Sequence, residues 1–415
     1  MLSPADLDAL DVLLAPTDRL LAERYPGDDG RRQPVHTVYV PADRFHAGTA
    51  RAWGDEAARL VTEHDGWARL AGDLVRPDLA DDLARRAAAK LATDPVEDLR
   101  IDLEDGYGLR DDDTEDADVV AAAHEVARAA ADGLLPRSVG LRVKCLEAPL
   151  RRRSVRTLGL FLTTLLEHGP LPTGLVTTLP KVSTAAQVEA MRQVCERLET
   201  ALGLAAGVLR FEVQVETPPV VLGADGRVPL TDCLTAGQGR VTSLHYGTYD
   251  YSASIGVAAG DQSLEHPAAD LAKGLMQLAV AGTGVHLSDG STNVVPTGDA
   301  DQARAAWALH HRLVRRSLSR GIYQGWDLHP GHLPTRYLAT FGYYREGLDA
   351  AATRLSAYLQ KVEGDVMDEP ATAKALSGFV VRALRCGAVD PDEVDARTGL
   401  GPDQLDTLAR TGALR

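Results

Sequence analysis

The chain has 415 residues, of which 45% are hydrophobic and 25% charged, the composition of an ordinary globular protein. Its net charge of −15 argues against a nucleic-acid partner, because phosphate binding needs concentrated Lys and Arg. No apolar run approaches the roughly 20 residues that a membrane span needs, and residues 1–16 lack the basic segment of a secretory signal. We therefore expect a cytoplasmic protein that binds small molecules and has no membrane partner.

Four widely separated cysteines form no CxxC pair: Cys145, Cys195, Cys233 and Cys386. They are expected to be reduced packing residues of a cytosolic protein.

The pattern of residues 1–35 predicts a helix over 4–14 that could extend as far as Arg24. A polar, glycine-rich loop is predicted to follow it. Eight short apolar runs follow, at 36–41, 99–104, 139–144, 175–181, 210–216, 241–247, 282–287 and 322–328. Between them lie segments rich in Ala, Leu and Arg whose apolar residues recur at helical spacing. Ser183 and Thr184 are candidate N-caps for the helix after the fourth run.

Eight strands alternating with helices predict an α/β protein with a parallel (β/α)₈ TIM barrel. A doubly wound sheet is the alternative, but it would need a glycine-rich phosphate loop, and no run is followed by GxGxxG. We expect residues 36–332 to form the barrel, with a helical insertion of two or three helices at 45–98 covering one end. The acidic run 110–118 is expected to be a solvated loop and helix start rather than a cation site.

The chain continues for almost 90 residues beyond the last predicted strand. Residues 333–362 predict one or two long helices, and 371–384 predict another. Because a barrel closes without them, residues 333–415 are expected to form a helical extension, or lid, that covers a barrel mouth or contacts a neighbouring subunit.

Charged side chains stand at almost every predicted strand end. They are Asp43 and Arg44, Asp102, Glu104 and Asp105, Arg142 and Lys144, Lys181, Glu216, Asp250, Asp289, and Asp327 with His329. In a TIM barrel these carboxyl ends meet at one mouth, where the chemistry takes place. Glu216 and Asp250 come from adjacent strands and are oxygen donors of the kind that suits Mg²⁺ or Mn²⁺. Such an ion could chelate a 2-oxo acid and act as a Lewis acid.

Each of these residues also has a structural interpretation. A carboxylate at a strand end often caps a helix or pairs with an arginine. His329, followed by Pro330, is expected to anchor a loop more readily than to act as a base. Lys181 could form a Schiff base, but an ion pair with a neighbouring carboxylate is the favoured interpretation.

Eight motifs resemble, in the same order, those of the HpcH/HpaI aldolase and citrate lyase β-subunit superfamily, over residues 38–383. They are VYVPADRF (38–45), IDLEDG (101–106), LRVKC (141–145), LPKV (179–182), VQVET (213–217), YGTYDYSASIG (246–256), LHPGHL (328–333) and VMDEPATAKAL (366–376). The last is similar to a segment of the acyl-CoA lyase branch. The resemblance implies a metal-dependent (β/α)₈ barrel.

The resemblance also implies roles for individual residues. Glu216 and Asp250 would bind the metal, Arg142 would hold the oxygen of an enolate or oxo acid, and Glu104 and Asp105 would line the site and orient metal-bound waters. Asp368 would be the general acid/base, on a C-terminal lid that reaches the active site of a neighbouring subunit. That arrangement implies a homo-oligomer, a trimer or hexamer. Arg44, Lys181 and His329 are assigned to substrate binding.

The chain departs from the superfamily around the expected pocket. Gly-Tyr-Gly follows Asp105, Tyr249 replaces an acidic residue, and Pro218 and Pro219 replace a small stretch after Glu216. The resemblance therefore implies the metal chemistry more strongly than it implies the identity of the substrate.

These features together predict an enzyme, a Mg²⁺-dependent carbon-carbon lyase or aldolase. It would cleave a 3-hydroxy acid, or its CoA thioester, to a 2-oxo acid and an acyl enolate product, or catalyse the reverse condensation. One alternative is a class II pyruvate-type aldolase that acts on free hydroxy-oxo acids without CoA. Another is a non-catalytic barrel that binds a metabolite.

Overall fold

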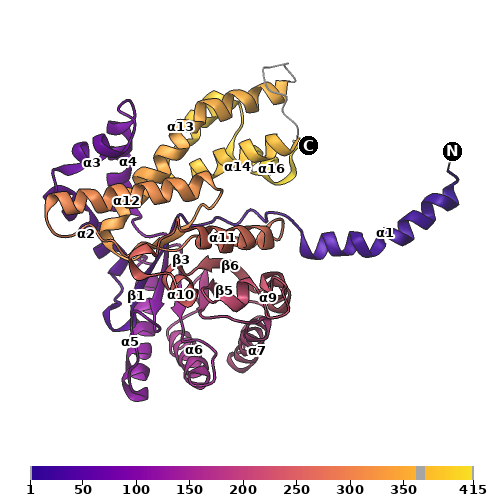
Figure 1. The fold of residues 1–415 in the computed structure, drawn as a ribbon, viewed down its shortest axis with the longest axis horizontal. Coiled ribbons are helices and arrows are strands. Elements are labelled where there is room, and N and C mark those ends of the chain that lie inside the picture. The colour runs from indigo at the N-terminus through magenta and orange to yellow at the C-terminus, as the bar shows by residue number, and fades with distance from the viewer. Residues whose placement is uncertain (1, 361–369, 414–415) are drawn as a thin grey trace.

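A computed structural model describes residues 2–360 and 370–413. Eight parallel strands form one sheet in the order β7-β6-β5-β4-β3-β2-β1-β8 (Figure 1). The strands are β1 (His36–Pro41), β2 (Asp98–Asp102), β3 (Ser138–Arg142), β4 (Leu175–Leu179), β5 (Arg210–Val215), β6 (Val241–Tyr246), β7 (His286–Ser288) and β8 (Gly325–Asp327). A parallel bridge between Ser288 and Gln324 brings β7 beside β8 and nearly closes the sheet. The predicted (β/α)₈ barrel is therefore confirmed.

The last two strands are shorter than the apolar runs that predicted them. Gly282 and Gly284 both have φ of +76°, a left-handed conformation that does not continue a strand. The chain turns through both glycines before β7 begins at His286. The run at 282–287 is therefore mostly a turn that ends in a short strand.

Helices follow the strands and cover the outside of the barrel. They are α5 (Asp112–Ala131), α6 (Arg151–Leu166), α7 (Ala185–Leu202), α8 (Pro218–Val221), α9 (Leu230–Gly237), α10 (Thr248–Ser254), α11 (Pro267–Val280) and α12 (Ala300–Ser319). Thr184, one of the two candidates from the sequence, is the N-cap of α7, and its amide donates to Gln187 Oε1 at 3.1 Å. The acidic run 110–118 begins α5, where Asp111 accepts a hydrogen bond from the Thr114 amide at 2.9 Å.

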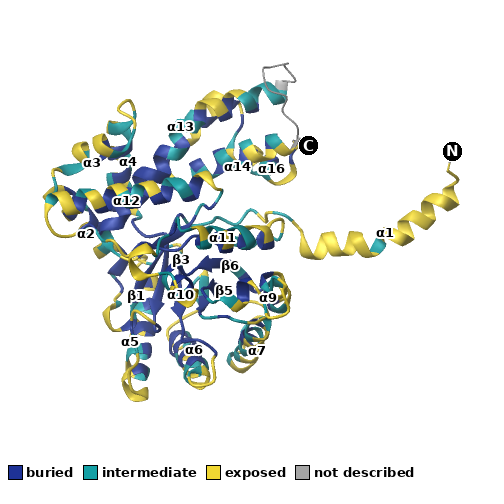
Figure 2. Ribbon diagram, viewed as in Figure 1, coloured by how far each residue is buried: buried dark blue, intermediate teal, exposed yellow. Residues whose placement is uncertain are grey.

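The barrel interior is polar at its centre. Arg100 donates two hydrogen bonds to Glu212, of 3.0 and 2.7 Å, and both side chains are buried. His245 Nε2 lies 3.1 Å from the same carboxylate, and Trp326 Nε1 donates to His245 Nδ1 at 2.9 Å. Because the charges are paired and hydrogen-bonded, their desolvation cost is offset. The apolar strand residues alternate with these polar ones and are buried as well, and Figure 2 shows the strands as buried.

The insertion after β1 forms three helices, α2 (Thr49–Glu63), α3 (Gly66–Leu74) and α4 (Ala80–Thr93). A short 3₁₀ turn, η1 (Ala42–Arg44), precedes them. The C-terminal extension forms α13 (Leu333–Gln360), α14 (Pro370–Cys386), α15 (Pro391–Thr398) and α16 (Pro402–Thr411). Helix α13 packs on α4, α12 and α14, so the insertion and the extension share one packed layer.

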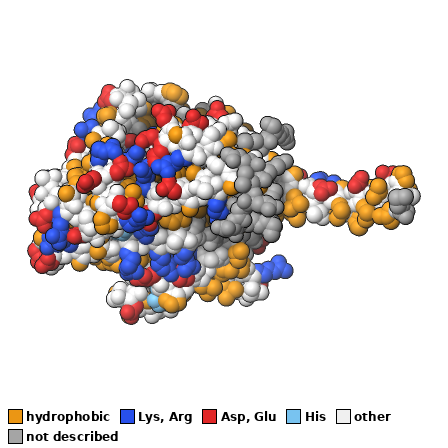
Figure 3. Space-filling model, turned by 90° about the horizontal axis from the view of Figure 1, so that it is seen from above, with side chains coloured by type: hydrophobic (Ala, Val, Ile, Leu, Met, Phe, Trp, Pro, Cys, Tyr) orange, Lys and Arg blue, Asp and Glu red, His pale blue; other side chains and the backbone are white. Residues whose placement is uncertain are grey.

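Helix α1 (Pro4–Arg24) projects away from the rest of the chain (Figure 1). It has no buried residue, although it carries seven large exposed hydrophobic side chains: Leu7, Leu10, Val12, Leu13, Leu14, Leu20 and Leu21. Figure 3 shows hydrophobic side chains along this projecting arm. No helix in the described part of the chain is both long enough and apolar enough to cross a bilayer.

All four cysteines are free thiols and buried, as expected.

Candidate active site

The carboxyl ends of the strands bring six of the predicted site residues to one mouth of the barrel. Glu104 and Asp105 follow β2, Arg142 ends β3, Lys181 follows β4, Glu216 follows β5, and Asp250 lies in the first turn of α10 after β6. We call this group the strand-mouth cluster. Parallel strands place such residues together because their carboxyl ends share one edge of the sheet.

Lys181 lies at the centre of the strand-mouth cluster. Its Nζ is 2.6 Å from Glu104 Oε1, 2.9 Å from Asp105 Oδ2 and 3.1 Å from Asp250 Oδ2. The backbone of Lys181 has φ of +51°, which is uncommon for a residue other than glycine. In this conformation its amide donates to Glu216 Oε1 at 2.7 Å. One residue therefore contacts all four carboxylates.

Glu216 is 1% exposed, and its second oxygen accepts a hydrogen bond from Gln214. Burial raises the pKa of Glu216 to about 8, and the negative charges of Asp250 and Glu104 add to this rise although Lys181 opposes it. Gly247 leaves the space that this side chain occupies, because a Cβ there would lie 2.5 Å from Glu216 Cβ. The rise therefore comes mainly from the removal of this carboxyl group from water, and the neighbouring carboxylates are a smaller cause.

The pKa values of other charged groups in the strand-mouth cluster are shifted as well. Burial raises the pKa of Glu104, whereas the hydrogen bond from Lys181 helps to lower that of Asp105 against the effect of burial. Burial alone would lower the pKa of Lys181, but Glu216 and Glu104 raise it well above its ordinary value. Lys181 is therefore an ammonium ion at neutral pH, which supports the ion-pair interpretation over a nucleophilic amine.

Arg142 is held by Asp102 through two hydrogen bonds of 2.6 Å, from Nε and Nη2. Its Nη1 lies 3.5 Å from Glu104 Oε2, and its guanidinium stacks 4.7 Å from the centre of the Tyr39 ring. Burial opposes the charge of Arg142, but Asp102 raises its pKa well above the ordinary value. Arg142 is thus a fixed cation with one nitrogen turned towards Glu104.

Three side chains that support the site were not assigned roles from the sequence: Asp102, Tyr39 and Gln214. Asp102 stood among the strand-end residues, but its pairing with Arg142 depends on the register of β2 and β3, in which the two residues are opposite. Gln214 is two residues before Glu216, so the period of two along a strand could have placed both on one face. Tyr39 had no comparable signal in the sequence.

The remaining predicted residues lie elsewhere or outside the described part. Arg44 is exposed at the end of η1, and His329 Nδ1 accepts a hydrogen bond from the Gly331 amide at 3.1 Å. In the described residues, no hydrogen bond or ion pair joins either side chain to the strand-mouth cluster. The His329 contact fits the loop-anchor interpretation. Asp368 lies outside the described residues.

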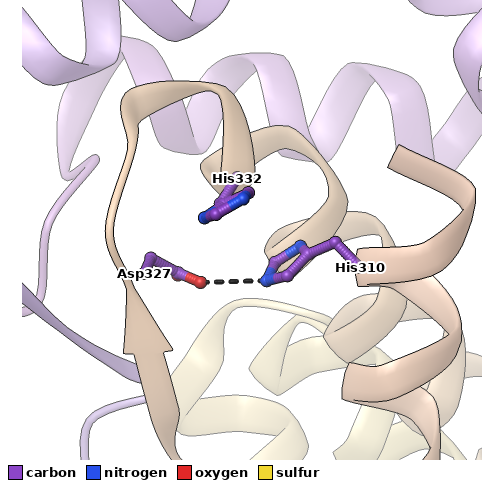
Figure 4. A group of neighbouring side chains, drawn as sticks. All are labelled: His310, Asp327 and His332. Atoms are coloured by element: carbon purple, nitrogen blue, oxygen red, sulfur yellow. Dashed lines mark hydrogen bonds and ion pairs between the residues drawn. The ribbon is translucent and has the colours of Figure 1, made fainter. Parts of the chain in front are cut away.

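A second group of metal-ligating residue types, His310, Asp327 and His332, is buried between β8, α12 and the 3₁₀ turn η3 (Pro330–His332) (Figure 4). His310 Nε2 is 3.0 Å from Asp327 Oδ1, and Arg336 Nη2 donates to the same oxygen at 2.8 Å. His36 Nδ1 is 3.0 Å from Asp327 Oδ2. Because Arg336 already neutralises Asp327, a further cation would be repelled, and we interpret the group as a structural network.

The strand-mouth cluster instead has the donors that a hard divalent cation requires. Four carboxylates surround one ammonium group, and the only other cation of the cluster, Arg142, has its Nη1 3.5 Å from Glu104 Oε2. Asp250 is 45% exposed, so an ion can reach it from solvent. The residues present therefore fit Mg²⁺ or Mn²⁺.

Comparisons with solved structures support the fold. A citrate lyase from Burkholderia xenovorans is 17% identical with a TM-score of 0.56, and the match covers 88% of this chain and 96% of that one. A malate synthase from Haloferax volcanii, solved as a magnesium/glyoxylate complex, is 14% identical with a TM-score of 0.52, covering 91% and 98%. These comparisons confirm the barrel fold that the resemblance to the citrate lyase superfamily implied.

No curated protein matches the chain. Residues 14–413 match the family described as Domain of unknown function (DUF6986). Since that match covers almost the whole chain, the protein belongs to the DUF6986 family.

Proposed function

We propose that this protein is a Mg²⁺-dependent carbon-carbon lyase. It would cleave a 3-hydroxy acid or its CoA thioester to a 2-oxo acid and an acyl enolate product, or catalyse the reverse condensation. The observation that carries the proposal is the convergence of Glu216, Asp250, Glu104 and Asp105 beside a fixed Arg142. The Haloferax malate synthase, which shares the fold, was solved with magnesium and a 2-oxo acid, glyoxylate.

Glu216 and Asp250 are the proposed metal ligands, with Glu104 and Asp105 placed to hold metal-bound water. A bound Mg²⁺ would supply Lewis-acid polarisation of the oxo-acid oxygens. Binding of this ion is expected to displace Lys181 from the carboxylates, so that its ammonium group can pair with an anionic substrate.

Arg142 is proposed to stabilise the oxygen that becomes negative as the carbon-carbon bond breaks. Its Nε and Nη2 are occupied by Asp102, so Nη1 is the nitrogen that can donate to an enolate oxygen. Because Asp102 fixes the guanidinium before the reaction, little reorganisation is needed when the charge develops.

Proton transfer to or from the enolate carbon is assigned to Asp368. The resemblance places this residue on a lid from a neighbouring subunit of a homo-oligomer. Complementation between inactive variants tests this assignment. Glu216→Gln and Asp368→Asn should each be inactive alone, and a refolded mixture should regain part of the activity because some sites then combine two intact residues. If the mixture stays inactive while each variant alone keeps its fold, Asp368 does not act across subunits.

The activity itself is tested with 3-hydroxy acids that carry a second carboxylate on carbon 3, as CoA thioesters and as free acids, because their cleavage releases a 2-oxo acid. We expect turnover that requires Mg²⁺, stops with a chelator and returns when the ion is added back. Turnover of free hydroxy-oxo acids alone would favour the class II aldolase. Full activity after exhaustive chelation would exclude the metal role.

A further inference from the structure

A cavity of about 370 Å³ lies at the opposite end of the barrel from the strand-mouth cluster. It is bounded by the loop before β1, by residues at the amino ends of β7 and β8, and by α14 and α16. Gly27, in that loop, donates its amide to the Gly282 oxygen at 2.8 Å, which fixes the loop against the barrel. The cavity therefore belongs to the body of the protein but not to the proposed active site.

Positive charge dominates the cavity in a chain whose net charge is −15. Five cationic side chains line it: Arg31, Lys374, Arg382, Arg385 and Arg410. The carboxylates that line it are Asp28 and Asp406. A local excess of positive charge in a strongly acidic protein favours anions at this place.

Only two of these cations are paired with a carboxylate among the described residues. Arg385 Nη2 is 2.9 Å from Asp406 Oδ1, and Arg31 pairs with Asp29. Lys374, Arg382 and Arg410 make no ion pair with any described carboxylate. Within the described part of the chain, these three cations of the cavity therefore have no carboxylate partner.

The arginines are positioned by contacts other than ion pairs. Arg382 stacks on Tyr323, with Cζ 4.2 Å from the ring centre. A Cβ at Gly378 would lie 3.2 Å from Arg382 Nη1, so the glycine leaves room for the guanidinium. Arg410 passes Gly30 in the same way, because a Cβ there would lie 3.4 Å from Arg410 Cδ. Lys374, Gly378 and Arg382 are spaced by four residues and share one face of α14.

His286, at the start of β7, also lines the cavity. Burial lowers the pKa of His286 to about 4, the charges of Arg31 and Arg382 add to the lowering, and those of Asp28 and Asp29 oppose it. The imidazole is therefore neutral at pH 7 and can donate a hydrogen bond to an anion without adding charge.

We propose that this cavity binds a small polyanionic metabolite, with phosphate groups or several carboxylates. Arginine and lysine are the side chains that bind such groups in proteins, and the cavity volume lies at the lower end of the range for metabolite sites. The proposal is independent of the carbon-carbon lyase activity and adds a second ligand site at the other end of the barrel.

Isothermal titration calorimetry of the full chain without divalent metal tests the proposal, with pyrophosphate in one arm and citrate in the other. We expect one of the two anions to bind saturably at one site per chain, and the arm that binds identifies a phosphate or a carboxylate ligand. Replacing the exposed Lys374 and Arg410 with Ala should weaken binding by about tenfold or more, equal to about 1.4 kcal/mol. Arg382→Gln is a second variant that removes the stacked cation.

Arg227→Ala is the matched control, because its side chain is 81% exposed and does not line the cavity. It should bind the anion as the unchanged protein does. The proposal is overturned if neither anion binds saturably, or if the Lys374 and Arg410 double variant binds as tightly as this control.

Discussion

At the scale of single residues, Lys181 and the proposed metal compete for the same carboxylates. The ammonium group contacts Glu104, Asp105 and Asp250 at 2.6, 2.9 and 3.1 Å. Lys181→Met removes this competing charge, so Mg²⁺ should bind about tenfold more tightly, a change of about 1.4 kcal/mol. Lys181→Arg keeps the positive charge, so its affinity for Mg²⁺ should not increase. If both variants bind Mg²⁺ equally tightly, Lys181 and the metal do not compete. Sodium borohydride with a 2-oxo acid should trap no adduct on Lys181.

Gly247 offers a test of how closely Glu216 is held. Gly247→Ala places a Cβ 2.5 Å from Glu216 Cβ and 2.7 Å from its Oε2, so the carboxylate must move. Overpacking of this kind typically costs about 1–3 kcal/mol of stability, and the shift should also weaken Mg²⁺ binding. Gly260→Ala is the control, because its Cβ would meet no atom within 4 Å. In calorimetric titration, Gly247→Ala should bind Mg²⁺ more weakly than the unchanged protein does. Gly260→Ala should bind it with unchanged affinity.

The sequence predicted the members of the strand-mouth cluster better than it predicted their partners. A residue that follows a parallel strand lies at the barrel mouth whatever the detailed register, so Glu104, Lys181, Glu216 and Asp250 could be grouped from spacing alone. The pairing of Arg142 with Asp102 needs the register of two strands, which spacing does not give. The central place of Lys181 depends on its left-handed backbone, which also has no signal in the sequence.

At the scale of elements, the first six strands were predicted within about two residues because each is an apolar run bounded by polar ends. The last two were predicted too long, since glycines with positive φ divide the run before β7. Helix α1 continues to Arg24, the furthest end given by the sequence, although Pro16 lies inside it. The sequence did not show that this helix would leave the body of the protein.

Helix α1 is expected to be the first segment that a protease attacks. It buries no residue, and an isolated helix of about 20 residues is only marginally stable in water. Limited trypsin digestion should therefore cut first after Arg19, and the trimmed protein should keep its Mg²⁺ affinity and its unfolding midpoint. Protection of Arg19 while loops of the barrel are cut would show instead that another surface covers α1.

At the scale of the whole molecule, buried histidines make stability depend on pH. Burial lowers the pKa of His286 and His311 to about 4 and that of His332 to about 3. Unfolded histidines titrate near 6.5, so below that pH the unfolded state binds more protons and the free energy of unfolding falls. Each group contributes up to about 1.4 kcal/mol per pH unit. The raised pKa of Glu216 acts in the opposite direction between about 4.5 and 8, but three histidines outweigh it below 6.5.

Urea denaturation of the metal-free protein at pH 6.5 and pH 5 measures this dependence. The midpoint should be lower at pH 5, and His332→Asn should reduce the difference between the two values. A midpoint that does not change between these pH values would contradict the assignment of neutral, buried histidines.

The two ends of the barrel differ in charge. Excess carboxylates at the strand mouth suit a metal ion and its oxo acid, whereas the cavity between α14, α16 and the amino ends of β7 and β8 is lined by arginines. Because the two sites share no residue, each can be tested with the other intact.

The measurement that tests the central claim most directly is calorimetric titration of the protein with Mg²⁺ at pH 7, in buffers of different ionisation enthalpy. One ion should bind per chain with release of close to one proton, because Glu216 has a pKa of about 8 and must lose its proton to bind metal. Glu216→Gln and Asp250→Asn should each lose at least tenfold in affinity, about 1.4 kcal/mol, while keeping their fold. Asp232→Asn, a change to an exposed acid in the first turn of α9, should have no effect. Binding that survives Glu216→Gln, or no saturable binding to the unchanged protein, would contradict the account.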